Sequence, residues 1–298
     1  MTVRDLGYRP YEGQRLPASR NTWVLLRHGL ARAWASWLVK LAIGVSIAIV
    51  LVVGAYTFVL SRIVAAISQM GSTQDLVGLC RSQYTWQIWF CVLLVSLGAG
   101  SGVIANDSRN RAFQFYFSKP VTPEQYLLGR TLPVSILCAL ITFAPAVIEI
   151  VVLITLAPTR EESVSRVGLI FPALGFSALI GLVVGPLSVA ASALAKSRAL
   201  TMAAWAAFFV LPHLVAALTD GVVMLADRGS GRDAEGFPWL FLGSVPALLG
   251  YVGDALFRAP GVETAKVGWM HAAPILGGIV AGSIALTWWR LRRVEVIG

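Results

Sequence analysis

Long, uninterrupted runs of apolar residues dominate the hydrophobic pattern of the chain. Each run is close to or above the roughly 20 residues that a helix needs to cross a bilayer. A transmembrane β-barrel would instead show short segments of alternating polarity. We therefore expect an all-α, polytopic membrane protein with one transmembrane domain at residues 41–290. Its six predicted transmembrane helices are 41–60, 86–105, 126–156, 167–194, 200–218 and 272–289.

The segment before the first run has an amphipathic rather than a uniformly apolar pattern. On a helical wheel, its Trp and Leu residues share one stripe: Trp23, Leu26, Leu30, Trp34 and Trp37. Its polar residues lie opposite: His28, Arg32, Ser36 and Lys40. This pattern is typical of a helix in the headgroup plane. We predict an interfacial amphipathic helix at 21–40, with a plain cytosolic extension of the first span as the alternative, and an N-terminal tail at 1–20.

Residues 219–271 form a long connection between the fifth and sixth runs. Its apolar patch, 237–257, is interrupted by Pro246 and Gly250. Irregular backbone at membrane depth is tolerated only against protein or water. The pattern therefore favours a re-entrant or interfacial pair of helices on the external side.

Composition and charge support a membrane location. The chain is 57% apolar and 13% charged, whereas soluble domains are about 45–50% apolar and about 25% charged. With six spans, the side that carries both termini holds 16 Lys and Arg against five acids, and the other side holds eight against nine. The positive-inside rule then places 1–40 and the C-terminal 291–298 in the cytoplasm, at the inner membrane. The net charge of +9 is thus explained by topology, and no nucleic-acid partner is expected.

A basic and aromatic stretch, SRNRAFQFYFSKPVTPEQYLLGR, interrupts the apolar pattern at 108–130. Asp107 or Ser108 can cap a short helix at about 107–117, which ends before Lys119-Pro120 because proline disfavours helix in the preceding residue. After Val121, residues 122–125 read TPEQ, which is a helix start with a capping box. The aromatic rings and cations of the short helix need a surface to pack against, either the lipid headgroups or a groove in a soluble protein.

The cytoplasmic segment IANDSRNRAFQFYFSKPVTPEQYLLGR resembles the corresponding loop of type-2 ATP-binding-cassette (ABC) permeases. The six-span layout matches over most of the chain, and the motif matches over this loop. The matching positions are Asp107, Arg109, Arg111, Lys119-Pro120, Tyr126 and Gly129-Arg130.

The resemblance implies an exporter subunit that dimerises, with itself or with a related chain, and sits on two cassette ATPase subunits. The 107–117 helix would be the coupling helix, and the 219–271 segment the re-entrant pair. The residues expected to couple to the ATPase are Asp107, Arg109, Arg111, Phe113, Phe115 and Lys119.

The chain itself contains no G-x-x-x-x-G-K-[ST] motif, so ATP and Mg²⁺ are expected on the partner ATPase. Its Cys and His residues are scattered without metal-ligand spacing. We therefore expect no catalytic, cofactor or metal site in this chain. The alternative functions are a secondary transporter of unrelated fold and a membrane scaffold that transmits ATPase-driven motion.

Glu149 is the only carboxylate inside a predicted span. A charge at membrane depth costs several kcal/mol, so Glu149 is a candidate for a translocation or proton path. The alternative is that it meets headgroup water near the outer end of its span, with Arg160 or Arg166 as a partner. Glycine pairs at four-residue spacing, such as Gly181/Gly185 and Gly278/Gly282, predict close helix packing.

Overall fold

The computed structural model describes residues 20–67, 73–110, 112–113, 121–157, 159–229, 237–258 and 267–297. Within these ranges the chain is helical and contains no strand. Among the described residues, six helical segments are long and apolar enough to cross a membrane, which confirms the predicted number of spans and a multi-pass architecture. They are Trp37–Val59, Arg81–Arg109, Pro123–Thr155, Arg160–Leu194, Arg198–Leu225 and Trp269–Arg293.

Two of these spans, Arg81–Arg109 and Arg160–Leu194, are built from more than one element, and the first of them contains two stretches of π-helix, η2 and η3. The elements of the first half of the chain are α1 (Arg20–Ala35), α2 (Trp37–Ile67), α3 (Thr73–Trp86), η2 (Gln87–Val92), α4 (Leu93–Val95), η3 (Ser96–Gly100) and α5 (Val103–Arg109). Those of the second half are α7 (Pro123–Thr155), α8 (Arg160–Val167), α9 (Ile170–Leu194), α10 (Arg198–Gly229), the 3₁₀ helix η4 (Pro238–Gly243), α11 (Val245–Leu256) and α12 (Trp269–Ile297).

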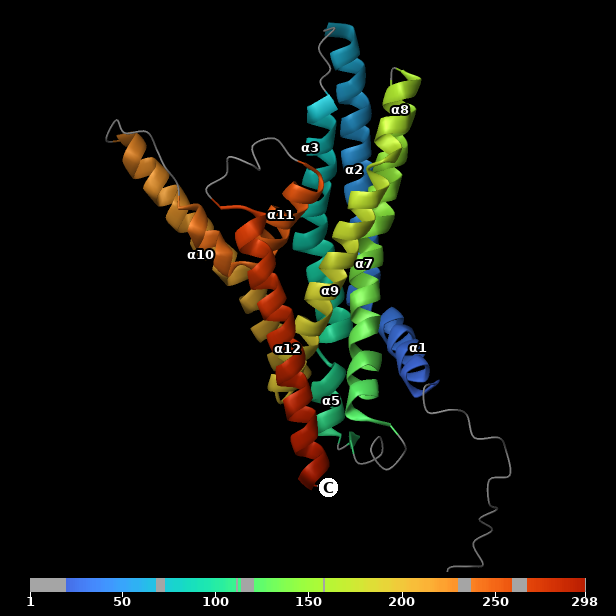
Figure 1. Cartoon of the computed structure of the whole chain (residues 1–298), viewed down its shortest axis with the longest axis vertical. Coiled ribbons are helices and arrows are strands. Elements are labelled where there is room, and N and C mark those ends of the chain that lie inside the picture. The colour runs from blue at the N-terminus through green and yellow to red at the C-terminus, as the bar shows by residue number, and fades with distance from the viewer. Residues whose placement is uncertain are drawn as a thin grey trace, which may run out of the picture.

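Helix α7 is the central element of the bundle and packs against α1, α2 and α9 (Figure 1). It begins with the predicted capping box, in which the Thr122 hydroxyl accepts from the Gln125 backbone N–H and the Gln125 side chain accepts from that of Thr122. The Gly181/Gly185 pair of α9 lies directly against Ser135 of α7, so a side chain at either position would collide with it. This pair is therefore a close-packing contact, as predicted. A Cβ placed on Gly278 or Gly282 would instead have no neighbouring atom within 4 Å.

The long connection after the fifth span is partly helical. Helix α10 runs beyond the predicted span to Gly229 and splays away from the bundle (Figure 1). Helices η4 and α11 occupy the predicted apolar patch, and α11 packs against α12 and α9. With 12 residues, α11 is too short to cross a bilayer, in agreement with a pair of short helices rather than another span.

The helix predicted at 21–40 ends earlier than expected. Helix α1 stops at Ala35, and Trp37 already begins α2. Leu25, Leu26 and Ala33 are buried, and α1 packs extensively on α7. Trp23 and Trp34 remain about 60% exposed. The predicted Trp/Leu stripe is thus wrong as a single face, because Leu26 is buried while Trp23 and Trp34 are largely exposed.

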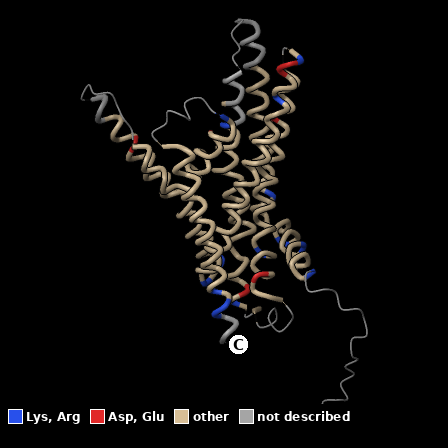
Figure 2. The backbone as a smooth tube through the Cα atoms, in the orientation of Figure 1, with Lys and Arg blue, Asp and Glu red and all other residues tan. Residues whose placement is uncertain are grey.

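Basic residues concentrate at one end of the bundle. Figure 2 shows Lys and Arg gathered where α5, the start of α7 and the end of α12 lie, and α1 adds further cations nearby. We call this the basic end and the opposite one the far end. At the basic end, Trp288 of α12 donates to Glu124 of α7 at 3.2 Å, and Arg292 stacks 3.9 Å from the Trp288 ring centre.

Candidate functional site

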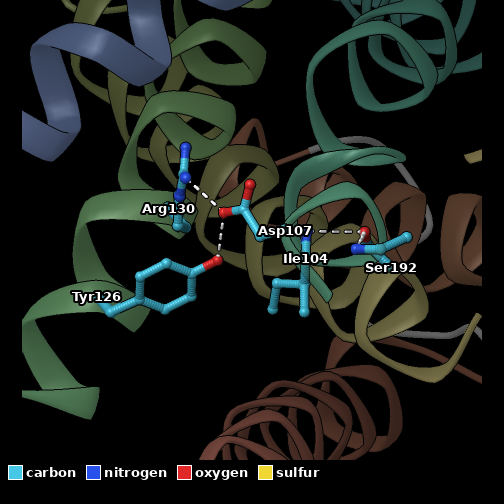
Figure 3. Close-up of polar contacts among 6 residues, drawn as sticks. Ile104, Asp107, Tyr126, Arg130 and Ser192 are labelled. Atoms are coloured by element: carbon cyan, nitrogen blue, oxygen red, sulfur yellow. Dashed lines mark hydrogen bonds and ion pairs between the residues drawn. The ribbon is translucent and has the colours of Figure 1, made fainter. Parts of the chain in front are cut away.

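Helix α5 lies at the basic end and closes the second span. Its N-cap residue, Gly102, provides no side-chain cap. Instead the Ser192 hydroxyl of α9 accepts hydrogen bonds from the backbone N–H groups of Ile104 and Ala105, both at 3.1 Å (Figure 3). The same hydroxyl donates to the Ser101 carbonyl at 3.2 Å. A residue of another helix therefore satisfies the free N–H groups at the start of α5, which attaches α5 to α9.

Asp107 is inside α5 and does not cap a later helix, so the predicted helix start at Asp107 or Ser108 is wrong. Its carboxylate turns towards α7, where it accepts from the Tyr126 hydroxyl at 2.7 Å and from the Arg130 guanidinium (Figure 3). All three residues are buried. We call Asp107, Tyr126 and Arg130 the α5–α7 joint. Removing one partner of such a buried ion pair costs about 3–5 kcal/mol, so the joint holds α5 firmly on α7.

Phe113, which lies beyond α5, also points into the protein. It is 5% exposed, and its ring packs edge-on against Tyr126 with ring centres 5.5 Å apart. Asp107 and Phe113 therefore fix the position of the segment and do not present a surface to a partner. Arg109 is exposed at the end of α5. The other predicted coupling residues, Arg111, Phe115 and Lys119, lie outside the described residues.

Glu149 lies in the half of α7 towards the far end and is fully buried. Its Oε1 is 2.8 Å from the Thr57 hydroxyl of α2, and its Oε2 has no hydrogen-bond partner. The expectation that Glu149 meets headgroup water is therefore wrong. The suggested arginine partner is wrong for Arg166, which binds Glu162 at 3.4 Å and the Leu153 carbonyl.

The second span contains buried polar residues that the sequence reasoning missed. Gln83 and Gln87 are one helical turn apart and almost completely inaccessible, and neither amide has a partner for its oxygen or nitrogen. Their elements, α3 and η2, pack against both α2 and α7, and the π-helix begins at Gln87. The signal in the sequence was two glutamines at four-residue spacing beside an apolar run.

Within the described part of the chain, no group of three or more His, Cys, Asp or Glu side chains gathers in a way that could hold a metal ion. No protein-family model matches the chain, and the comparison with curated proteins gave no match.

Proposed function

We propose that this chain is the membrane-spanning permease subunit of an ATP-driven ABC transporter, working as an exporter in the inner membrane. Two copies, or one copy and a related chain, form the translocation unit. Two separate cassette ATPase subunits bind ATP and Mg²⁺ at the cytoplasmic face, which is the basic end. The proposal rests on the loop resemblance and on how the described part of that loop is built.

The observation that carries the proposal is the α5–α7 joint. The joint fixes the end of the second span to the start of the third, and Ser192 fixes the same short helix to the fourth. Because packed helices move as rigid bodies, a displacement applied just after α5 is passed to three spans together. Asp107 and Phe113 hold this segment in place, while Arg109 together with Arg111, Phe115 and Lys119 contacts the ATPase.

The exposure of the spans leaves apolar surface for a second permease subunit. In their most apolar stretches, 11% of the residues are buried in the fifth span and 22% in the first, against 61% in the second. Large apolar side chains of α10 such as Leu211, Val215 and Leu218 are more than half exposed. These faces are available to lipid or to a second copy of the permease.

The experiment is purification of the tagged full chain from its native membranes, with identification of co-purifying proteins and measurement of ATP hydrolysis. We expect a cassette ATPase to co-purify with the parent chain. The combined variant Arg111→Glu and Phe115→Ala should no longer retain it. Arg160→Glu, at an exposed far-end position, is the matched control and should retain the ATPase. Unchanged co-purification in the double variant would overturn the proposed coupling surface.

Glu149 keeps the secondary transporter open as a second candidate, because a fully buried carboxyl with one free oxygen suits a proton path. Proton-driven uptake by the chain alone in liposomes would favour that candidate over the permease. ATP hydrolysis by the complex without movement of any solute would instead favour a scaffold that transmits motion to another assembly.

A further inference from the structure

A cationic chamber of about 210 Å³ lies among α1, η3, α7 and the start of α10. Three arginines line it, Arg32, Arg130 and Arg198, and none of its lining residues is a carboxylate. Asp107 neutralises Arg130. Arg32 and Arg198 form no ion pair with any described residue, and the buried Ser36 hydroxyl oxygen in the chamber wall has no partner. The chamber is therefore suited to an anionic group.

An apolar cleft of about 410 Å³ lies between α2 and α7. On α7 the cleft begins about one helical turn beyond the chamber, since Leu137 is the first α7 residue of the cleft and Val134 the last α7 residue of the chamber. Its walls are aliphatic apart from Trp34 and from Ser46, whose hydroxyl is directed at the Ile141 carbonyl. Wall residues such as Leu51 and Leu140 are more than half exposed, so the cleft opens towards the hydrocarbon of the bilayer.

Lining residues of the chamber and of the cleft pack against the same residue, Gly98. A Cβ built on Gly98 would lie 3.0 Å from the Ser36 hydroxyl, which belongs to the chamber, and 3.1 Å from Val39, which belongs to the cleft. The cationic chamber and the aliphatic cleft therefore follow each other along the bundle axis, beside the junction of α1 and α2.

We propose that these two hollows form one binding site for an anionic phospholipid from the surrounding leaflet. The phosphate lies in the chamber beside Arg32 and Arg198, and an acyl chain lies in the cleft. Guanidinium groups are well matched to phosphate oxygens, and basic pockets between transmembrane helices bind anionic headgroups. The cleft also falls within the range of about 300–1,000 Å³ that is usual for ligand sites. The site is independent of the proposed ATPase partner.

The test is a titration of the purified full chain in detergent with phosphatidylglycerol, phosphatidylcholine or inorganic phosphate, with bound molecules counted by native mass spectrometry. We expect phosphatidylglycerol to bind far more tightly than the other two. Combining Arg32→Gln with Arg198→Gln should weaken that binding by about thirtyfold, from about 1 kcal/mol per cation near a lipid surface. Arg27→Gln, an exposed cation of the same helix outside the chamber, is the control and should bind like the parent protein.

A second variant tests the apolar half of the site. Ala144→Trp places a large ring in the cleft and should weaken phosphatidylglycerol binding, while Ala281→Trp, at an exposed position of α12, should not. Equal binding of the two phospholipids, or equal loss in the Arg27 control, would contradict the proposal. Inorganic phosphate that displaces phosphatidylglycerol at equal concentration would show an anion site without a lipid, which also contradicts it. Thermal unfolding in phosphatidylcholine shows whether each variant remains folded.

Discussion

Two regions of the bundle bury polar side chains in opposite ways. In the α5–α7 joint, the Asp107 carboxylate has two donors. In the half towards the far end, Gln83, Gln87 and Glu149 are buried as deeply, yet their amide groups and one carboxylate oxygen have no partner. A satisfied buried network fixes one arrangement of helices, whereas an unsatisfied one costs stability. The difference indicates that Asp107 fixes α5 on α7, whereas Gln83, Gln87 and Glu149 retain polar capacity for another use.

The largest effect is expected from Asp107→Ala, which removes the carboxylate of the α5–α7 joint. The change removes the carboxylate that pairs with the buried Arg130 guanidinium, and we expect it to lower the free energy of unfolding in detergent by about 3–5 kcal/mol. Adding Arg130→Met removes the cation of the same pair and should restore much of that loss. A double variant as unstable as the single one would contradict a joint held by this ion pair.

Close packing of α1 on α7 should make the next largest contribution to stability at the basic end. A Cβ built on Gly129 would lie 2.5 Å from the Leu25 Cβ, and one built on Gly29 would lie 2.5 Å from the Pro133 ring. Gly129→Ala should therefore destabilise the protein by about 1–3 kcal/mol. Gly44→Ala, in α2 with nothing within 4 Å, serves as the control and should not. Equal unfolding temperatures for the two variants would show that α1 does not pack as described.

Gln87→Leu probes the region with unpaired buried polar groups. It should raise the free energy of unfolding rather than lower it. An unpaired buried amide costs about 1–3 kcal/mol, so replacing it with an apolar side chain of similar size should stabilise the protein by about 1 kcal/mol. Chemical unfolding in detergent measures the effect. Strong destabilisation would instead show that the Gln87 amide is bound to something in the native protein.

Glu149→Gln should change stability by less than about 1 kcal/mol. The Thr57 hydroxyl lies 2.8 Å from Glu149 and 2.9 Å from the Val53 carbonyl, and its single proton can serve only one of them. A neutral acid or an amide at position 149 supplies the second proton, so the two side chains are equivalent here. A loss of several kcal/mol, measured by the same unfolding assay, would show that the native protein requires a carboxylate at this position.

The smallest effect is expected at the far-end pair of Arg81 and Asp254, 2.7 Å apart. Burial raises the pKa of the Asp254 carboxyl, and Arg81 lowers it by a smaller amount. The folded chain therefore binds this proton more readily than the unfolded chain, so this contribution to stability decreases as pH rises from about 4. Asp254→Asn should remove that slope and change stability by no more than about 1 kcal/mol, which unfolding at several pH values measures.

Hydropathy was sufficient to predict the spans, because a bilayer crossing requires a long apolar run whatever its neighbours are. The start of α7 was also predictable, because its capping box lies within four consecutive residues. The start of α5 was not, because its cap comes from Ser192 of another helix. The burial of Phe113 and the split of the α1 stripe were missed for the same reason, since each depends on contacts with α7.

The central claim is that the segment following α5 is seated on a cassette ATPase. The most direct test places a photo-crosslinking amino acid at position 115 in the full chain, irradiates native membranes and identifies the adduct by mass spectrometry, with position 160 as control. We predict an adduct to a P-loop ATPase from position 115 alone. Adducts only to lipid at position 115, or the same ATPase adduct from both positions, would contradict the account.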